Sequence, residues 1–289
     1  MDEKTEHLRI SPFDVFGRAG EEGSRTPFAD PVRRFVENAV IVFQALFRWF
    51  NPSAYVATKI IMPLEQLLAF GLLARYAGGQ GKVSYLVVGN AIALAGLGGF
   101  SAAGTVGEER SQATLPMLIA SPANRLLNFL ERGLVHILDA LVSVAIALVF
   151  AATVFHVDFG SLNLGAFAAA VLVATVSSIA LGLFLGAIAI AWSEFFLVTN
   201  LLYLVVLVLA GVNFPVSALP GWIQPLSYVL PFTRSIESAR HALHGASLTA
   251  VAPSLLGELG LAVSYLVLGY AFLRRMEALA IRRGTLEMT

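Results

Sequence analysis

The stretch GEERSQATLPMLIASPANR, residues 107–125, lies between two long apolar segments and resembles neither of them. It opens with three consecutive charged residues and continues into a short apolar patch between Pro116 and Pro122. The whole chain is 57% hydrophobic and 13% charged, whereas soluble domains are about 45–50% apolar and about 25% charged. This composition indicates a membrane protein, so we expect residues 107–125 to form a loop at a membrane surface.

Six apolar segments approach the roughly 20 residues that are needed to cross a bilayer. They are residues 55–76, 83–106, 129–155, 164–192, 195–213 and 253–273. The fourth and fifth segments are separated only by the short connection at residues 192–194. Taken as one segment they would be about 50 residues long, far more than a single crossing uses. The sequence therefore predicts an all-α polytopic membrane protein with six transmembrane helices, within a domain at residues 53–275.

The flanking regions are polar or amphipathic. Residues 1–30 are polar and aperiodic, which indicates a cytosolic tail, and residues 276–289 are expected to form a second one. On a helix over residues 31–52, Arg34, Asn38 and Arg48 lie in one polar stripe opposite an apolar face. Such a helix lies in the membrane interface; the alternative is a short first span.

The basic residues set the orientation. With a cytoplasmic N-terminus, the opposite side holds only Arg75, Lys82, Arg234 and Arg240, while the tails and residues 107–125 hold most of the others. We therefore expect both termini to be cytoplasmic, and residues 107–125 to face the cytoplasm.

The cytoplasmic stretch has a small apolar face. Proline favours the first turn of a helix, and Leu115, Leu118 and Ile119 then share one side at i, i+3, i+4 spacing. Such a turn fits a groove on a partner protein. On spacing alone, an ordinary interfacial loop is an equal alternative.

Residues 211–247 form an unusual external connection. They are too apolar for an aqueous loop, and too rich in proline for a normal crossing helix. Irregular backbone at membrane depth needs cover from protein or a water-filled cavity. We expect short re-entrant helices in the outer leaflet, with Trp222 and Tyr228 as interface anchors; a long external loop is the alternative.

These two stretches together resemble the membrane subunit of ABC type-2 exporters, the permease family of daunorubicin-type drug and polysaccharide transporters. The residues that match the first family motif are Glu109, Arg110, Thr114, Leu115, Ser121 and Pro122. The residues that match the second are Gly211, Pro215, Leu219, Pro220, Trp222, Pro231 and Arg240. Ala113 departs from the pattern, because the family usually has glycine there.

The resemblance implies a permease with an interfacial elbow helix, six spans and external re-entrant helices, in the cytoplasmic (inner) membrane of a prokaryote. It implies a dimer with a second, identical or related permease, and two cytosolic ATPase subunits on separate chains. The ATPase-coupling segment comprises Glu108 and the first motif, with Leu118 and Ile119. This chain has no G-x-x-x-x-G-K-[ST] loop, so we expect it to bind no cofactor, with ATP and magnesium on the partner.

Several polar residues fall within the predicted spans. In the third, Arg132, His136, Asp139 and Ser143 share one stripe, in which His136 can bridge Arg132 and Asp139. That stripe either couples the cytosolic motif to the pathway or satisfies itself between packed helices.

Four further polar residues lie in other spans. Glu65 lies near the middle of the first, where a carboxylate lines the pathway, pairs with a neighbouring subunit or is protonated. Lys59 is expected to snorkel, and Asn90 and Asn200 to cross-link helices.

Other classes of function find little support. The chain has no cysteine, and the close pair His241 and His244 is weak support for zinc, so we expect no metal site. The zero net charge gives no indication of nucleic acid. The glycines in residues 96–107 and 182–186 indicate close helix packing. The function predicted is export of an amphipathic drug-like, lipid or glycan substrate; the alternative is an ion- or proton-coupled transporter that uses Glu65 and Asp139.

Overall fold

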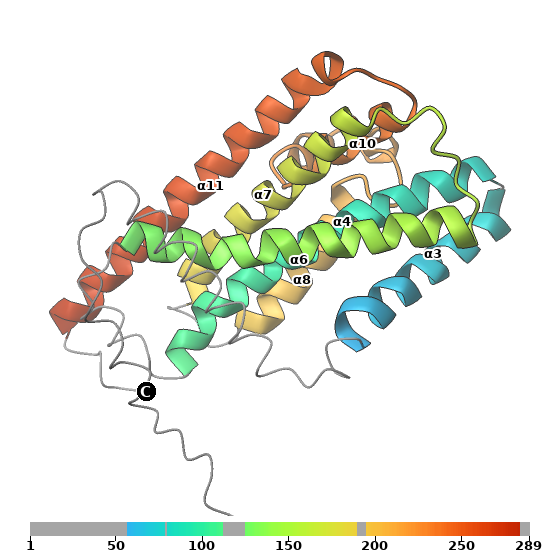
Figure 1. Cartoon of the computed structure of the whole chain (residues 1–289). Coiled ribbons are helices and arrows are strands. Elements are labelled where there is room, and N and C mark those ends of the chain that lie inside the picture. The colour runs from blue at the N-terminus through green and yellow to red at the C-terminus, as the bar shows by residue number, and fades with distance from the viewer. Residues whose placement is uncertain (1–56, 79, 112–124, 190–194, 284–289) are drawn as a thin grey trace, which may run out of the picture.

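The computed structural model describes residues 57–78, 80–111, 125–189 and 195–283, and this part of the chain forms helices without any strand (Figure 1). The elements are η1 (Ala57–Ile61), α3 (Met62–Gly78), α4 (Gln80–Ser111), α6 (Arg125–Val154), α7 (Leu164–Ala189), α8 (Phe195–Leu209), η2 (Val216–Ala218), α9 (Gln224–Ser227), α10 (Thr233–Leu243) and α11 (Leu248–Arg283). The predicted all-helical class is confirmed for these residues.

Each predicted apolar segment overlaps a helix, and two of the boundaries that differ have a visible cause. Helix α8 ends at Leu209, because Gly211 turns the chain with a φ of 78°. Helix α11 begins at Leu248, well before the expected start at Pro253. Ser247 caps it, since its hydroxyl oxygen accepts a hydrogen bond from the Ala250 N–H at 3.4 Å.

Two of the described helices are long and apolar enough to cross a membrane by themselves, at Leu164–Ile188 in α7 and Leu248–Met276 in α11. Shorter apolar helical stretches occur at Gly81–Gly96, Asp139–Val154 and Leu197–Leu209. The structure is thus that of a helical bundle with apolar helices, and the six-span topology stays a prediction.

Helix α7 lies at the centre of the bundle and packs closely against α4. At the crossing point a Cβ on Gly182 would overlap the carbonyl of Gly99, and a Cβ on Gly99 would overlap the carbonyl of Ser178. The predicted packing role of both glycine-rich segments is therefore confirmed at Gly99 and Gly182.

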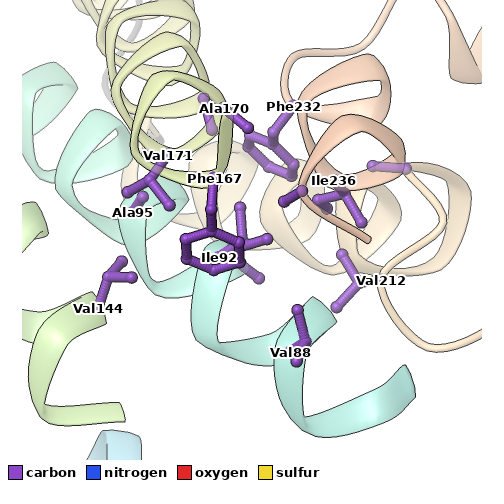
Figure 2. Packing of buried hydrophobic residues seen from close by; sticks show 14 of the residues in the cluster. Val88, Ile92, Ala95, Val144, Phe167, Ala170, Val171, Val212, Phe232 and Ile236 are labelled. Atoms are coloured by element: carbon purple, nitrogen blue, oxygen red, sulfur yellow. The ribbon is translucent and has the colours of Figure 1, made fainter. Parts of the chain in front are cut away.

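The connection between α8 and α11 belongs to the core. Figure 2 shows Phe232, the residue just before α10, and Ile236 of α10 directed toward side chains of α7 and α4. The labelled residues of this cluster are Val88, Ile92, Ala95, Val144, Phe167, Ala170, Val171, Val212, Phe232 and Ile236. The segment that the sequence marked as irregular is thus a packed part of the bundle.

The outside of the bundle is also apolar. Helix α8 exposes a stripe of large hydrophobic side chains that are between 44% and 61% accessible: Leu197, Leu201, Leu204, Val205 and Val208. Contiguous exposed apolar faces of this kind are normally covered by lipid or by another protein.

Candidate functional site

The segment after α8 folds into three short helical pieces, η2, α9 and α10, joined by tight turns. Prolines begin two of these pieces, because Pro215 precedes η2 and Pro225 lies in the first turn of α9. Leu219 is half-buried, Pro220 is exposed and Pro231 is buried. The expected short helices are therefore present, and their depth in a membrane stays a prediction.

Arg240 fastens α10 to the end of α8 and to α4. Its guanidinium donates hydrogen bonds to the carbonyl oxygens of Gly211 at 2.7 Å, Val212 at 2.8 Å and Tyr85 at 3.2 Å. The guanidinium carbon lies 3.4 Å from the centre of the Tyr85 ring, a close cation–π contact. Burial lowers the pKa of Arg240 to about 10, still well above neutral pH, so the side chain remains charged.

Gly89 of α4 makes room for this contact. A Cβ at this position would overlap both the Val212 carbonyl oxygen and the Arg240 guanidinium. Two elements far apart in sequence can therefore meet here only because α4 presents bare backbone.

A buried amide chain lies beside the Arg240 contact. Gln66 of α3 donates to the Asn90 side-chain oxygen at 3.1 Å, and Asn90 donates to the Asn213 side-chain oxygen at 2.8 Å. Asn90 is fully buried, so its predicted role in cross-linking helices is confirmed. Asn200 is exposed on α8, and its cross-linking role stays a prediction.

Glu258 of α11 forms a second polar anchor, which the sequence analysis missed. The carboxylate is fully buried and accepts hydrogen bonds from the Ser177 hydroxyl at 2.6 Å, the Phe232 N–H at 2.5 Å and the Arg234 N–H at 3.2 Å. Two of these donors are the free N–H groups at the start of α10. A carboxylate at a helix N-terminus is favoured by the helix dipole.

Phe232 holds its amide toward Glu258 in an unusual conformation. Its φ is 61°, in the left-handed region that non-glycine residues seldom adopt. The ring is fully buried and lies over Gly96, where a Cβ would meet the ring at 2.9 Å. The bonds to Glu258 and the packing on α4 together fix this conformation.

Further polar contacts lie on the exposed side of the segment between α8 and α11, which we call the rim. Arg234 donates to the Tyr228 carbonyl oxygen at 2.7 Å, and the Tyr228 hydroxyl donates to the Glu237 carboxylate at 3.2 Å. Trp222 is 81% exposed and Tyr228 is 37% exposed. Both rings are therefore accessible to water or lipid around the protein, and their role as membrane anchors stays a prediction.

The predicted polar stripe of the third apolar segment lies on α6. His136 is buried and Asp139 is half-buried, while the Ser143 hydroxyl donates to the Asp139 backbone carbonyl at 2.9 Å. The side chain of Arg132 lies outside the described residues, so the bridge through His136 stays a prediction.

Glu65 lies in the first turn of α3 and is exposed. Its carboxylate therefore points out of the bundle formed by one chain. The neighbouring prediction, snorkelling of Lys59, concerns a side chain outside the described residues.

The predicted coupling segment lies almost entirely outside the described residues. The backbone of Glu108, Glu109 and Arg110 forms the end of α4, but their side chains are not described. The other coupling residues, Thr114, Leu115, Leu118, Ile119, Ser121 and Pro122, and the predicted elbow helix at residues 31–52, lie in the undescribed ranges.

The part of the chain that the structure describes offers no group of three or more His, Cys, Asp or Glu side chains arranged to hold a metal ion. Several of its described polar side chains instead hydrogen-bond separate elements to one another.

The comparisons with known proteins define the class, a transporter membrane domain. The family model for the ABC-2 type transporter matches residues 38–244, and the chain belongs to this family. It is therefore a membrane protein, the ABC-type permease part of a transporter and not the ATPase. A search of curated proteins finds no match. The matched range ends just after α10, so Glu258 lies beyond it.

Proposed function

We propose that this chain is the transmembrane permease subunit of an ATP-driven exporter that works with a separate cytosolic ATPase. The observation that carries the proposal is the family match over residues 38–244. The absence of a phosphate-binding loop from this sequence is consistent with it. In this proposal two ATPase subunits, which hold ATP and magnesium, serve a dimer of this permease or a pair with a related one.

Helix α4 offers a direct mechanical path for such a partner. It runs without interruption from Gln80 to Ser111, a length of about 48 Å at 1.5 Å per residue. Its N-terminal part carries Tyr85 and Gly89, which contact Arg240. Its C-terminal end leads into residues 112–124. A displacement of the cytosolic end of α4 would therefore be passed along one continuous helix to the Arg240 contact, and so to residues 211–247.

The proposed topology has six spans, with both termini in the cytoplasm of a prokaryote. The long apolar helices α7 and α11 and the exposed apolar stripe of α8 support a membrane location. The elbow helix lies in the interface and residues 211–247 re-enter from outside. The proposed cargo is an amphipathic drug-like molecule, a lipid or a glycan, carried out of the cytoplasm.

The proposal is tested by co-expressing the chain with a candidate ATPase and measuring both complex formation and ATP-dependent transport in proteoliposomes. Glu109→Ala, Arg110→Ala and Leu118→Asp should weaken the complex and its coupled ATP hydrolysis. Leu164→Asp is the matched control, because Leu164 is 71% exposed at the opposite end of the bundle, at the start of α7.

Two outcomes would reject the proposal. An unchanged complex in all three coupling variants would remove the docking role of residues 107–125. Transport driven by a pH or sodium gradient, without any ATPase, would favour the alternative in which Glu65 and Asp139 are coupling groups.

A further inference from the structure

Helix α10 is held at its two ends by different sets of polar contacts. Its first turn is bound by Glu258 of α11, beside Ser177 of α7. Near its last turn, Arg240 binds the backbone of α4 and the residues that follow α8. The Asn163 N–H, just before α7, also donates to the Ala242 carbonyl at 2.9 Å, and the Ser161 hydroxyl donates to the Leu243 carbonyl at 2.8 Å. The start of this short helix is therefore held by α7 and α11, and its end by α4 and by the residues next to α7 and α8.

The polar contact between the first turn of α10 and α11 is concentrated in a single group, while Tyr265 of α11 separately binds the Val229 carbonyl and apolar residues of both helices share one core cluster. Both oxygens of Glu258 are used, one by Ser177 and Phe232 and the other by Arg234. Apolar surfaces can slide past each other in small steps, whereas a buried charge-assisted hydrogen bond is lost over a short displacement. The Glu258 contact therefore separates two discrete arrangements, one with α10 docked and one with α10 released.

The hydrogen bonds between Glu258 and the start of α10 are expected to be lost together. If α10 moved away, Glu258 would lose two of its three donors, and the start of α10 would lose its acceptor. Phe232 would at the same time lose the acceptor of the N–H that its left-handed backbone directs toward Glu258. Because these hydrogen bonds share Glu258 as their acceptor, they are expected to break together.

We propose that Glu258 is a positioning residue for transport, a latch that docks the start of α10 on α7 and α11 and must open for the external segment, residues 211–243, to move. The proposal rests on the proposed function only in calling that movement a transport step. The latch itself is a property of the single chain, so it can be tested without a substrate or an ATPase.

The test is a distance measurement by pulsed electron paramagnetic resonance on the full chain in lipid nanodiscs. The chain has no cysteine, so His241→Cys and Ser254→Cys provide two unique label sites on α10 and α11, both exposed. With Glu258 intact we expect one narrow distance distribution. In Glu258→Gln the carboxamide keeps one acceptor oxygen and turns its NH2 group toward a donor that the second carboxylate oxygen had accepted from, and the released fraction should rise roughly tenfold or more, as expected for the loss of one charge-assisted hydrogen bond.

A second label pair serves as the control. Leu164→Cys with Ser254→Cys reports on α7 and α11, which also pack together where Gly269 meets the backbone of Phe184. This distance should stay the same in Glu258→Gln. A parallel change in both pairs would overturn the latch in favour of a general loosening of the bundle.

A milder variant covers the case in which Glu258→Gln does not fold. Glu258→Asp keeps the charge but withdraws it by one methylene, and it should populate the released distance to a smaller extent. An unchanged distance between residues 241 and 254 in whichever of the two variants folds would overturn the proposal. If the distance between residues 241 and 254 changes in the Glu258 variants but the unsubstituted protein shows no ATP-driven transport, only the exporter assignment is rejected.

Discussion

Glu65 in α3 and Glu258 in α11 are both isolated carboxylates in apolar sequence, but their surroundings differ. Glu258 is fully buried and accepts three hydrogen bonds. Glu65 is exposed near the start of α3, on a helix whose Leu68 and Leu72 are also exposed. One carboxylate is thus satisfied inside the bundle, and the other is exposed on the part of the chain that the structure describes.

The difference shows that an isolated carboxylate in apolar sequence can be accommodated in two ways. A carboxylate at membrane depth costs a few kcal/mol unless donors surround it. For Glu258 the donors are Ser177 of α7 and the two N–H groups at the start of α10. For Glu65, exposed on the described bundle, donors would come from beyond the described residues, from solvent or from another molecule.

The largest expected effect comes from removing each carboxylate in turn. Glu258→Ala leaves buried donors without an acceptor and should lower the free energy of unfolding by about 3–5 kcal/mol, as for breaking other buried charged networks. Glu65→Ala should change it by less than about 0.5 kcal/mol, as for other exposed positions. The midpoint of thermal unfolding in one detergent, at a fixed scan rate, measures both. Equal shifts would show that burial in the single chain does not distinguish them.

Much of the helical framework was predictable from sequence. The six apolar segments predicted the six long helices, since apolar runs of this length favour helices in a membrane. The packing at Gly99 and Gly182 followed from their small size, and the cross-link through Asn90 from an amide in an apolar run. These features depend on local pattern.

The two anchors depend on contacts that local pattern does not contain. The motif singled out Arg240, but nothing local indicated that Tyr85 and Gly89 would meet it. Glu258 carried the same signal as Glu65, a lone carboxylate in an apolar segment, and was still missed. Which of the two would be buried depended on the placement of α10, including the left-handed backbone of Phe232.

The next largest effect is expected at the Arg240 anchor. Gly89→Ala would force a methyl group into the Val212 carbonyl and the guanidinium, and should cost about 1–3 kcal/mol, as overpacking generally does. Gly81→Ala is the matched control on the same helix, because a Cβ there meets nothing within 4 Å. It should be neutral or stabilise α4 by up to about 1 kcal/mol through helix propensity. Equal thermal shifts would contradict the close approach of α10 to α4.

A smaller effect is expected when the charge of the anchor is kept but its shape is changed. In Arg240→Lys an ammonium replaces the planar guanidinium that both stacks on Tyr85 and reaches three carbonyls. We expect a loss of about 1–2 kcal/mol, because lysine cannot reproduce the fork. Arg234→Lys, at the rim, should cost less than about 1 kcal/mol. A larger drop in the unfolding midpoint for Arg240→Lys than for Arg234→Lys would support the deeper burial of Arg240. The reverse order would contradict it.

The smallest effect compares two tyrosine hydroxyls, one on an exposed ring and one on a half-buried ring. Tyr228→Phe removes a hydrogen bond to Glu237 of 3.2 Å in an exposed site, and should lower the free energy of unfolding by at most about 0.5 kcal/mol. Tyr265→Phe removes a bond of 2.6 Å to the Val229 carbonyl from a half-buried ring, and should cost about 1 kcal/mol. Both variants keep their rings, so the difference in unfolding midpoint reports the hydroxyls alone. Because the half-buried Tyr265 ring leaves less room for water to replace the lost partner, a Tyr228→Phe shift as large as that of Tyr265→Phe would mean that the Tyr228 ring is covered as well, by lipid or by a neighbouring subunit.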